Sequence, residues 1–99
     1  MKDTFGNIIQ SKVPVLIDFH ATWCGPCQTL APILKEFKTE MGDAINVIKI
    51  DVDKNQELAQ RFQVRSVPTL MLFKEGRQIW RKSGLVSKRD LSEAIVPHK

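Results

Sequence analysis

The sequence predicts an α/β fold in which a central mixed β-sheet is flanked by helices. Strand-like runs alternate with helical patterns as far as residue 73, a short turn at Glu75-Gly76 then joins two strand-like runs directly, and a helical pattern closes the chain. Strands joined through crossover helices are expected to be parallel, whereas a tight turn gives an antiparallel hairpin. The length of 99 residues fits a single domain spanning residues 1–99.

The first half of the chain predicts a helix, a strand and a longer helix. Thr4 is the expected N-cap of a short helix, and Pro14 ends it. Residues 15–19 form an apolar run typical of a central strand, interrupted only by Asp18. The long helix follows Cys27, and Gly42 ends it. Its expected core-facing residues recur at helical spacing and are Leu30, Ile33, Leu34, Phe37 and Met41.

The second half predicts three strands and two helices. Residues 45–50 and 70–73 are strand-like, and residues 78–80 return from the second of these as the other arm of a hairpin. Between the first two strands, a polar connection at residues 51–55 leads to a short helix with Leu58, Ala59 and Phe62 facing inward. Ser87 and Asp90 resemble a capping box at the start of a final helix, which Pro97 ends.

Composition argues against nucleic-acid and membrane partners. The net charge is +4, but the basic excess is dispersed through the second half and is not interleaved with aromatic residues. No apolar run approaches the roughly 20 residues of a membrane span, and residues 1–6 lack the apolar region of a signal peptide. We therefore expect a cytoplasmic monomer that binds neither nucleic acid nor membrane.

The segment Trp23-Cys24-Gly25-Pro26-Cys27 holds both cysteines of the chain, between a predicted strand and a predicted helix. Residues three apart are neighbours on a helix, so the two thiols can join as a disulfide. Such a small loop scarcely restrains an unfolded chain, which indicates a chemical bond more than a structural one. The positive end of the helix would stabilise a Cys24 thiolate, Pro26 suits a first turn, and Gly25 lets another backbone come close.

This segment resembles the active-site motif of thioredoxins, and the resemblance covers nearly the whole chain. Supporting matches are Asp18, Lys49, Val67-Pro68-Thr69 and Gly84. The resemblance implies a thioredoxin-like fold, in which family members commonly begin with an edge strand that this chain starts too late to supply. It also implies a protein-disulfide reductase that maintains the redox balance of the cell.

The resemblance assigns roles to individual residues. Cys24 would attack a client disulfide, Cys27 would resolve the mixed disulfide, Asp18 would transfer protons to and from Cys27, and Lys49 would modulate Asp18. We expect the Cys24 sulfur to be accessible, with Cys27 beneath it. The bond before Pro68 would be cis, as in thioredoxins. The residues implied to bind extended client peptide are Trp23, Gly25, Pro26, Val67, Pro68 and Gly84.

The same resemblance implies the partners. No bound cofactor or metal is expected, and electrons would come from NADPH through thioredoxin reductase. The implied clients include ribonucleotide reductase, peroxiredoxin and methionine sulfoxide reductase. Gly25 and Pro26 place no cation between the cysteines, where one would make the disulfide more oxidising, so reduction of clients is favoured over oxidation.

Two polar residues near the motif leave alternatives open. Thioredoxins most often have tryptophan where this chain has His20, and strand alternation places His20 on the same face as Asp18. A titrating imidazole there could tune the thiols, although we favour a simple polar substitution at a partly exposed position. Asp18 itself, instead of moving protons, could accept a hydrogen bond from a helix end.

Two other classes of function compete with the redox interpretation. Cys24, Cys27, His20 and His98 could ligate zinc, although their spacing does not form the two compact ligand pairs usual in structural sites. The chain could also be an interaction subunit that keeps the fold without using the chemistry. Intact cysteines together with Asp18 and Pro68 disfavour that last alternative.

Overall fold

The computed structural model describes residues 4–99 of the chain. Its elements follow one another in the order that the sequence predicts, with two additional 3₁₀ turns, η1 and η2. The elements are α1 (Thr4–Ile9), β1 (Val15–His20), α2 (Gly25–Met41), η1 (Gly42–Ala44), β2 (Asn46–Asp51), α3 (Gln56–Arg61), β3 (Thr69–Lys74), β4 (Arg77–Ser83), α4 (Lys88–Ile95) and η2 (Val96–His98).

The described strands form one mixed sheet in the order β2-β1-β3-β4, so β2 and β4 are its edges. β1 and β2 are parallel, and β3 is antiparallel to both β1 and β4. The mixed sheet and the hairpin are confirmed, but the expectation that β3 runs parallel to the earlier strands is wrong. The six residues of α3 rise only about 9 Å, too little to carry the chain back along a strand of about 20 Å, whereas the 17 residues of α2 rise about 25 Å.

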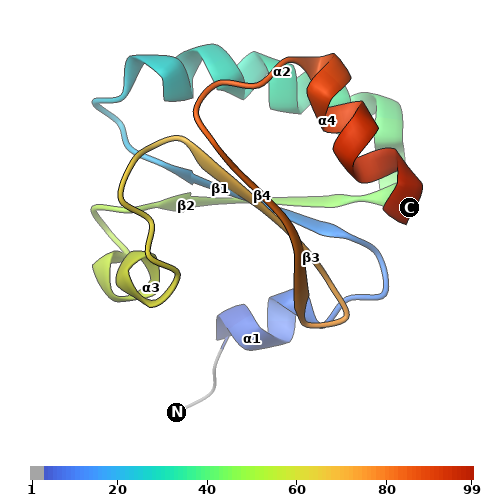
Figure 1. Ribbon diagram of the computed structural model, residues 1–99, viewed down its shortest axis with the longest axis horizontal. Helices are drawn as coiled ribbons and strands as arrows, with labels where there is room; N and C mark the ends of the chain where they lie inside the picture. Colours follow the sequence, from blue (N-terminus) through green and yellow to red (C-terminus); the bar gives the residue numbers. More distant parts are fainter. Residues whose placement is uncertain (1–3) are drawn as a thin grey trace.

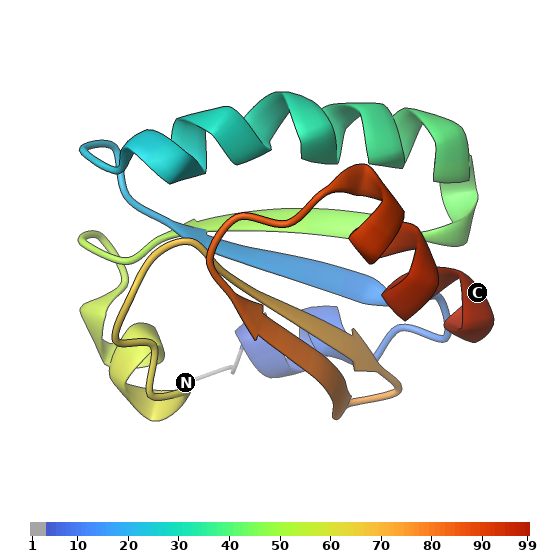
Figure 2. The same cartoon turned by 45° about the horizontal axis from the view of Figure 1, so that its top comes forward.

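Helices cover both faces of this sheet, as Figures 1 and 2 show, with α2 and α4 on one face and α1 and α3 on the other. Alternate residues of β1 supply the two halves of the core: Leu16 packs with α2 and α4, whereas Ile17 and Phe19 pack with α1 and α3. Asp18, two residues from Leu16, therefore faces the α2 side of the sheet.

Local signals define several element ends. Ser87 and Asp90 form the reciprocal capping box that the sequence predicts at the start of α4. Gly42 caps α2 with a positive φ of 56°, and its N–H donates to the carbonyl of Lys38. Thr4 is the first helical residue of α1 and not the expected cap. Pro97 lies inside η2, two residues beyond the end of the final α-helix at Ile95.

The topology brings the segments that resemble thioredoxin motifs together at one end of the sheet. β1 ends at His20, where the chain enters the cysteine segment, and β2 ends beside it at Asp51. β3 begins at this same end, because Thr69 pairs with Phe19. Cys24 and Pro68, which lie 44 positions apart in the sequence, are thereby brought into one neighbourhood.

Candidate active site around the cysteine pair

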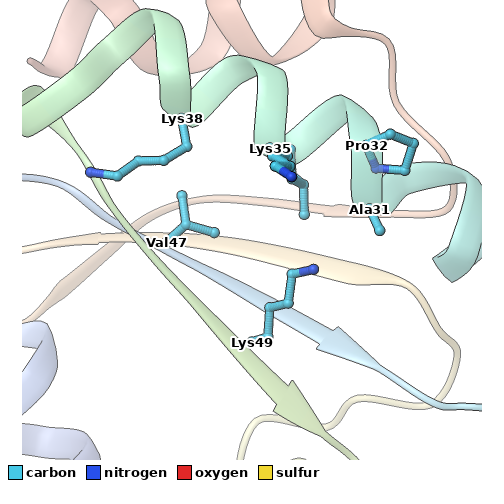
Figure 3. Close-up of a pocket in the computed structure, with 7 residues that line it drawn as sticks. Ala31, Pro32, Lys35, Lys38, Val47 and Lys49 are labelled. Carbon is cyan, nitrogen blue, oxygen red and sulfur yellow. The ribbon is translucent and has the colours of Figure 1, made fainter.

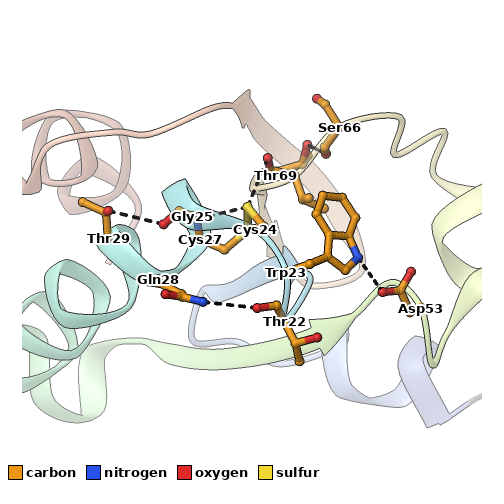
Figure 4. The surroundings of a disulfide bond; sticks show 11 residues. Thr22, Trp23, Cys24, Gly25, Cys27, Gln28, Thr29, Asp53, Ser66 and Thr69 are labelled. Atoms are coloured by element: carbon orange, nitrogen blue, oxygen red, sulfur yellow. Dashed lines mark hydrogen bonds between the residues drawn. A yellow bond between two sulfur atoms is a disulfide. The ribbon is translucent and has the colours of Figure 1, made fainter.

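Cys24 is the N-cap of α2 and is joined to Cys27 by a disulfide (Figure 4). Its extended backbone, with φ of −90° and ψ of 113°, places Sγ where it accepts a hydrogen bond of 3.1 Å from the Cys27 N–H. The two Cα atoms are 5.2 Å apart. Pro26 occupies the first turn, where its missing N–H removes no hydrogen bond within the helix. The sulfur of Cys24 thus lies at the positive end of the helix.

Both cysteines are buried in this disulfide form: Cys24 is 4% exposed and Cys27 is 6% exposed. The expectation that Cys24 alone would be accessible is therefore wrong for the oxidised protein. The disulfide joins the Cys24 sulfur to the buried Cys27 sulfur. On its other side Val67 covers Cys24, with the Val67 carbonyl oxygen 3.5 Å from Cys24 Sγ. A disulfide sulfur carries no proton, so this approach is a close contact and becomes a possible hydrogen bond only in the dithiol.

Asp18 is a buried carboxylate, 3% exposed, and its Oδ1 has no hydrogen-bond partner within residues 4–99. Burial raises the pKa of Asp18 above its usual value of 3.8, and the nearby charges of His20 and Lys49 partly offset the rise. The hydrogen bond from a helix end that could have explained a buried Asp18 is not seen in the described part of the chain. A buried carboxylate without such a partner is a candidate for a functional role.

A cavity of about 150 Å³ connects the carboxylate to the cysteine pair. It is bounded by Asp18 and His20 from β1, Cys27 from α2, and Lys49 from β2. Asp18 and Lys49 are partners in the register of the two parallel strands. Figure 3 shows Lys49 rising from β2 toward α2. The sequence-predicted group of Asp18, Lys49 and Cys27 is thus brought together, and His20 belongs to the same cavity.

The chain matches the family model described as Thioredoxin over residues 1–96. A thioredoxin of Mycobacterium bovis is 48% identical over 96 residues, which cover 93% of this chain and 82% of that protein. The chain belongs to the thioredoxin family. The crystal structure of a thioredoxin from Malassezia sympodialis superposes with a TM-score of 0.87 at 36% identity, covering 97% of this chain and 86% of that one.

Thioredoxins are thiol–disulfide oxidoreductases, and the Cys24–Cys27 disulfide is the redox pair of this one. A further relative is a bifunctional thioredoxin reductase/thioredoxin of Mycobacterium leprae, 46% identical over 98 residues. The match covers 95% of this chain but only 21% of that longer protein. In that relative, a reductase and a thioredoxin are parts of one polypeptide.

Beside the thioredoxin disulfide lies an exposed surface formed by Trp23 and the segment before β3. Trp23 is 70% exposed, and a groove of about 120 Å³ runs between it, Arg65 and Val67. The Val67-Pro68 bond is cis, as the resemblance implies. Gly84 does not line this groove; its N–H instead donates to the Pro68 carbonyl at 2.8 Å, with a positive φ of 92° that favours glycine.

Asp53 contributes to this surface, although the sequence predicts only a polar connection there. Its Oδ2 accepts a hydrogen bond of 2.8 Å from the Trp23 indole N–H, across 30 positions of sequence (Figure 4). Asp51 stabilises the turn of this connection, because its carboxylate accepts from the N–H groups of Asp53 and Lys54. No local pattern could have linked Asp53 to Trp23.

The alternative zinc ligands are not assembled. Both cysteines are consumed in the disulfide, and His98 lies in η2, where its carbonyl accepts from Lys74 at the other end of β3 from the site. Across residues 4–99, no three side chains of His, Cys, Asp or Glu gather into a metal-binding group. Over the same range, none of the helices is long and apolar enough to cross a membrane.

Proposed function

We propose that this thioredoxin reduces the disulfides of client proteins, with Cys24 as the nucleophile and Cys27 as the resolving thiol. The Cys24 thiolate attacks one sulfur of a client disulfide, and the other client sulfur leaves as a thiolate that takes a proton from water. Cys27 then attacks Cys24, breaks the mixed disulfide and releases the second client thiolate. The client gains two electrons, and the protein keeps the Cys24–Cys27 disulfide.

The observation that carries this proposal is the unequal placement of the two sulfurs. Cys24 Sγ accepts the Cys27 N–H at the start of α2, where a thiolate gains a charge-assisted hydrogen bond and the favourable helix dipole. Cys27 instead borders the cavity that holds the unpartnered carboxylate of Asp18. One site favours the attacking thiolate, and the other supplies a base for the thiol that must lose its proton later.

Asp18 is the proposed proton acceptor of Cys27, and Lys49 modulates it. A buried carboxylate is a stronger base than one in water, because burial disfavours its charge. Lys49 acts in the opposite sense, since its positive charge lowers the pKa of Asp18. The effect of burial is the larger of the two, so the pKa of Asp18 is raised and the carboxylate is the more basic for it.

Clients are proposed to bind as extended peptide along the cis-proline segment. The surface there is apolar at the exposed Trp23 and offers backbone groups at Val67. Extended peptides pair with free backbone groups and place alternate side chains in shallow pockets. The residues assigned to this surface are Trp23, Gly25, Pro26, Val67, Pro68 and Gly84, with Gly84 acting through its hydrogen bond to Pro68.

The electron supply and the cellular setting complete the proposal. The protein needs no bound cofactor, and a thioredoxin reductase that draws on NADPH would return the disulfide to the dithiol. The fusion of a reductase to a thioredoxin in the Mycobacterium leprae relative supports such a partner. Proposed clients are ribonucleotide reductase, peroxiredoxin and methionine sulfoxide reductase, in the cytoplasm.

Reduction of insulin disulfides by the purified protein with dithiothreitol tests the proposal. Cys24→Ser should abolish turnover above the dithiothreitol background, and Cys27→Ser should accumulate a mixed disulfide that mass spectrometry detects on Cys24. Thr39→Ser, an exposed change on the same helix, is the matched control and should behave as wild type. Turnover that survives in Cys24→Ser would contradict the assigned nucleophile.

The reduction potential tests the direction of the reaction. Equilibration against glutathione should place it near the value of about −270 mV typical of thioredoxins. A potential near −120 mV, about that of a strong oxidant, would instead make the protein a donor of disulfides.

A further inference from the structure

His20 is the feature of the site that the redox mechanism above does not use. It ends β1 two residues after Asp18, on the same face of the sheet, and its side chain is only partly buried. It borders the cavity of about 150 Å³ together with Asp18 and Cys27. The imidazole thus shares a cavity with the buried carboxylate and is itself more exposed to solvent.

A proton that Asp18 accepts from Cys27 must leave through the cavity that Asp18 and His20 both border. The carboxylate is 3% exposed, its Oδ1 has no hydrogen-bond partner in the described structure, and its strand neighbours Ile17 and Phe19 are fully buried. A proton left on Asp18 would disable it as a base for the next cycle. A residue at the edge of the cavity must therefore pass this proton to water.

Of the ionisable residues that line the cavity besides Asp18 and Cys27, only His20 has the chemistry for this exchange. Lys49 also borders the cavity, but an ammonium group has no lone pair with which to accept a proton. The residues that α2 contributes besides Cys27 are Gln28 and Ala31, and neither titrates. An imidazole both accepts and donates a proton near neutral pH.

We propose that His20 carries protons between Asp18 and solvent during the resolving step; the inference rests on the proposed role of Asp18 as the base for Cys27. The Cys27 thiol gives its proton to Asp18, and the resulting thiolate attacks Cys24 and expels the client thiolate. A neutral His20 imidazole then takes the proton from Asp18 and releases it to water. His20 acts through Asp18 and not on the sulfurs, so it is a positioning residue and not a catalytic one.

The charges around His20 fit this role. Asp18 faces His20 from its own strand. From β2 come Lys49 and Asp51, the register partner of His20, while α2 presents no charged side chain to the cavity. Protonated His20 lowers the pKa of Asp18, and its influence exceeds that of Lys49. Protonated His20 therefore favours the ionised form of Asp18, and it must release its own proton to water before the neutral imidazole can receive the proton of Asp18.

The resolving step can be isolated with 5,5′-dithiobis(2-nitrobenzoate), which releases one coloured thiolate when Cys24 attacks and a second when Cys27 resolves. In rapid mixing at pH 7, His20→Asn should slow the second release by about tenfold or more, a modest share of the roughly 10²–10⁴ that a positioned acid–base group supplies. The first release should be unchanged. His98→Asn, which removes the only other histidine, is the matched control and should leave both releases unchanged.

Chemical rescue separates proton transfer from packing. Added imidazole should restore the second release in His20→Ala and leave wild type unaffected. His20→Gln provides a second polar variant if His20→Asn folds poorly by circular dichroism. Failure of imidazole to rescue, or an undiminished second release in the folded variants, would overturn the role of His20. If Asp18→Asn leaves the second release unchanged, the proposed base is wrong instead.

Discussion

Asp18→Asn should make the protein more stable at neutral pH while impairing its chemistry. The substitution removes the charge of a carboxylate that is 3% exposed and whose Oδ1 lacks a hydrogen-bond partner within residues 4–99, and it keeps the side chain's shape. An unsatisfied buried polar group costs about 1–3 kcal/mol, and a charged one costs more than a neutral one. We expect the free energy of unfolding to rise by about 2 kcal/mol at pH 7.

The expected change in Tm follows from the size of the domain. Unfolding entropy of about 2.1 cal/mol/K per residue gives about 0.2 kcal/mol/K for 99 residues, so about 2 kcal/mol raises Tm by about 10 °C. Stability curves in urea, at pH 3 and pH 7, provide the free energies directly. Asp43→Asn, at an exposed carboxylate, is the matched control and should shift the free energy by less than about 0.5 kcal/mol.

The pH dependence gives this experiment its sharpest outcome. Because burial raises the folded pKa of Asp18 above its unfolded value, the wild type is penalised only where the carboxyl is ionised. Below the unfolded value of 3.8 both states hold the proton, so the gain from Asp18→Asn should vanish near pH 3. It should grow as the pH rises past that value and be complete above the folded pKa. An equal gain at both pH values, or none at pH 7, would refute the reasoning.

Three further perturbations test other parts of the molecule. Asp53→Ala removes the hydrogen bond to Trp23, worth about 1 kcal/mol, and should raise KM for insulin about fivefold without changing kcat; an unchanged KM would remove Asp53 from the client surface. Ser87→Ala removes the N-cap of α4 and should lower Tm by about 5 °C in calorimetry; an unchanged Tm would show that the cap is not stabilising. Leu34→Ala, at a side chain 1% exposed, should destabilise by about 2–5 kcal/mol in urea, and a loss below 1 kcal/mol would contradict its place in the core.

The sequence predicts features that depend on short stretches of chain. The apolar run at residues 15–19 becomes the central strand β1, because a strand covered on both faces needs continuous hydrophobicity. The Ser87 and Asp90 capping box forms because both partners lie within one helical turn. The disulfide is likewise local, since Cys24 and Cys27 are three residues apart.

Features that depend on contacts between distant parts of the chain are either not predicted from the sequence or predicted wrongly. The hydrogen bond from Trp23 to Asp53 joins segments 30 positions apart, and the link from Lys88 on α4 to Glu36 and Glu40 on α2 joins segments about 50 apart. The reversed direction of β3 depends on how far α3 reaches, which hydrophobic periodicity does not measure. The roles assigned to individual site residues came from family resemblance, which no residue pattern of this chain supplies unaided.

The burial of Cys24 in the disulfide bears on how the cycle turns over. A disulfide sulfur is neutral, so it gains little from the Cys27 N–H, and Val67 covers it with a carbonyl oxygen at 3.5 Å. The proposed Cys24 thiolate of the reduced protein would gain a charge-assisted hydrogen bond from the same N–H and would be repelled by that carbonyl. The thiolate is thus held toward the helix and pushed away from Val67. Reduction therefore favours separation of the Cys24 sulfur from the segment on which a client peptide would pair.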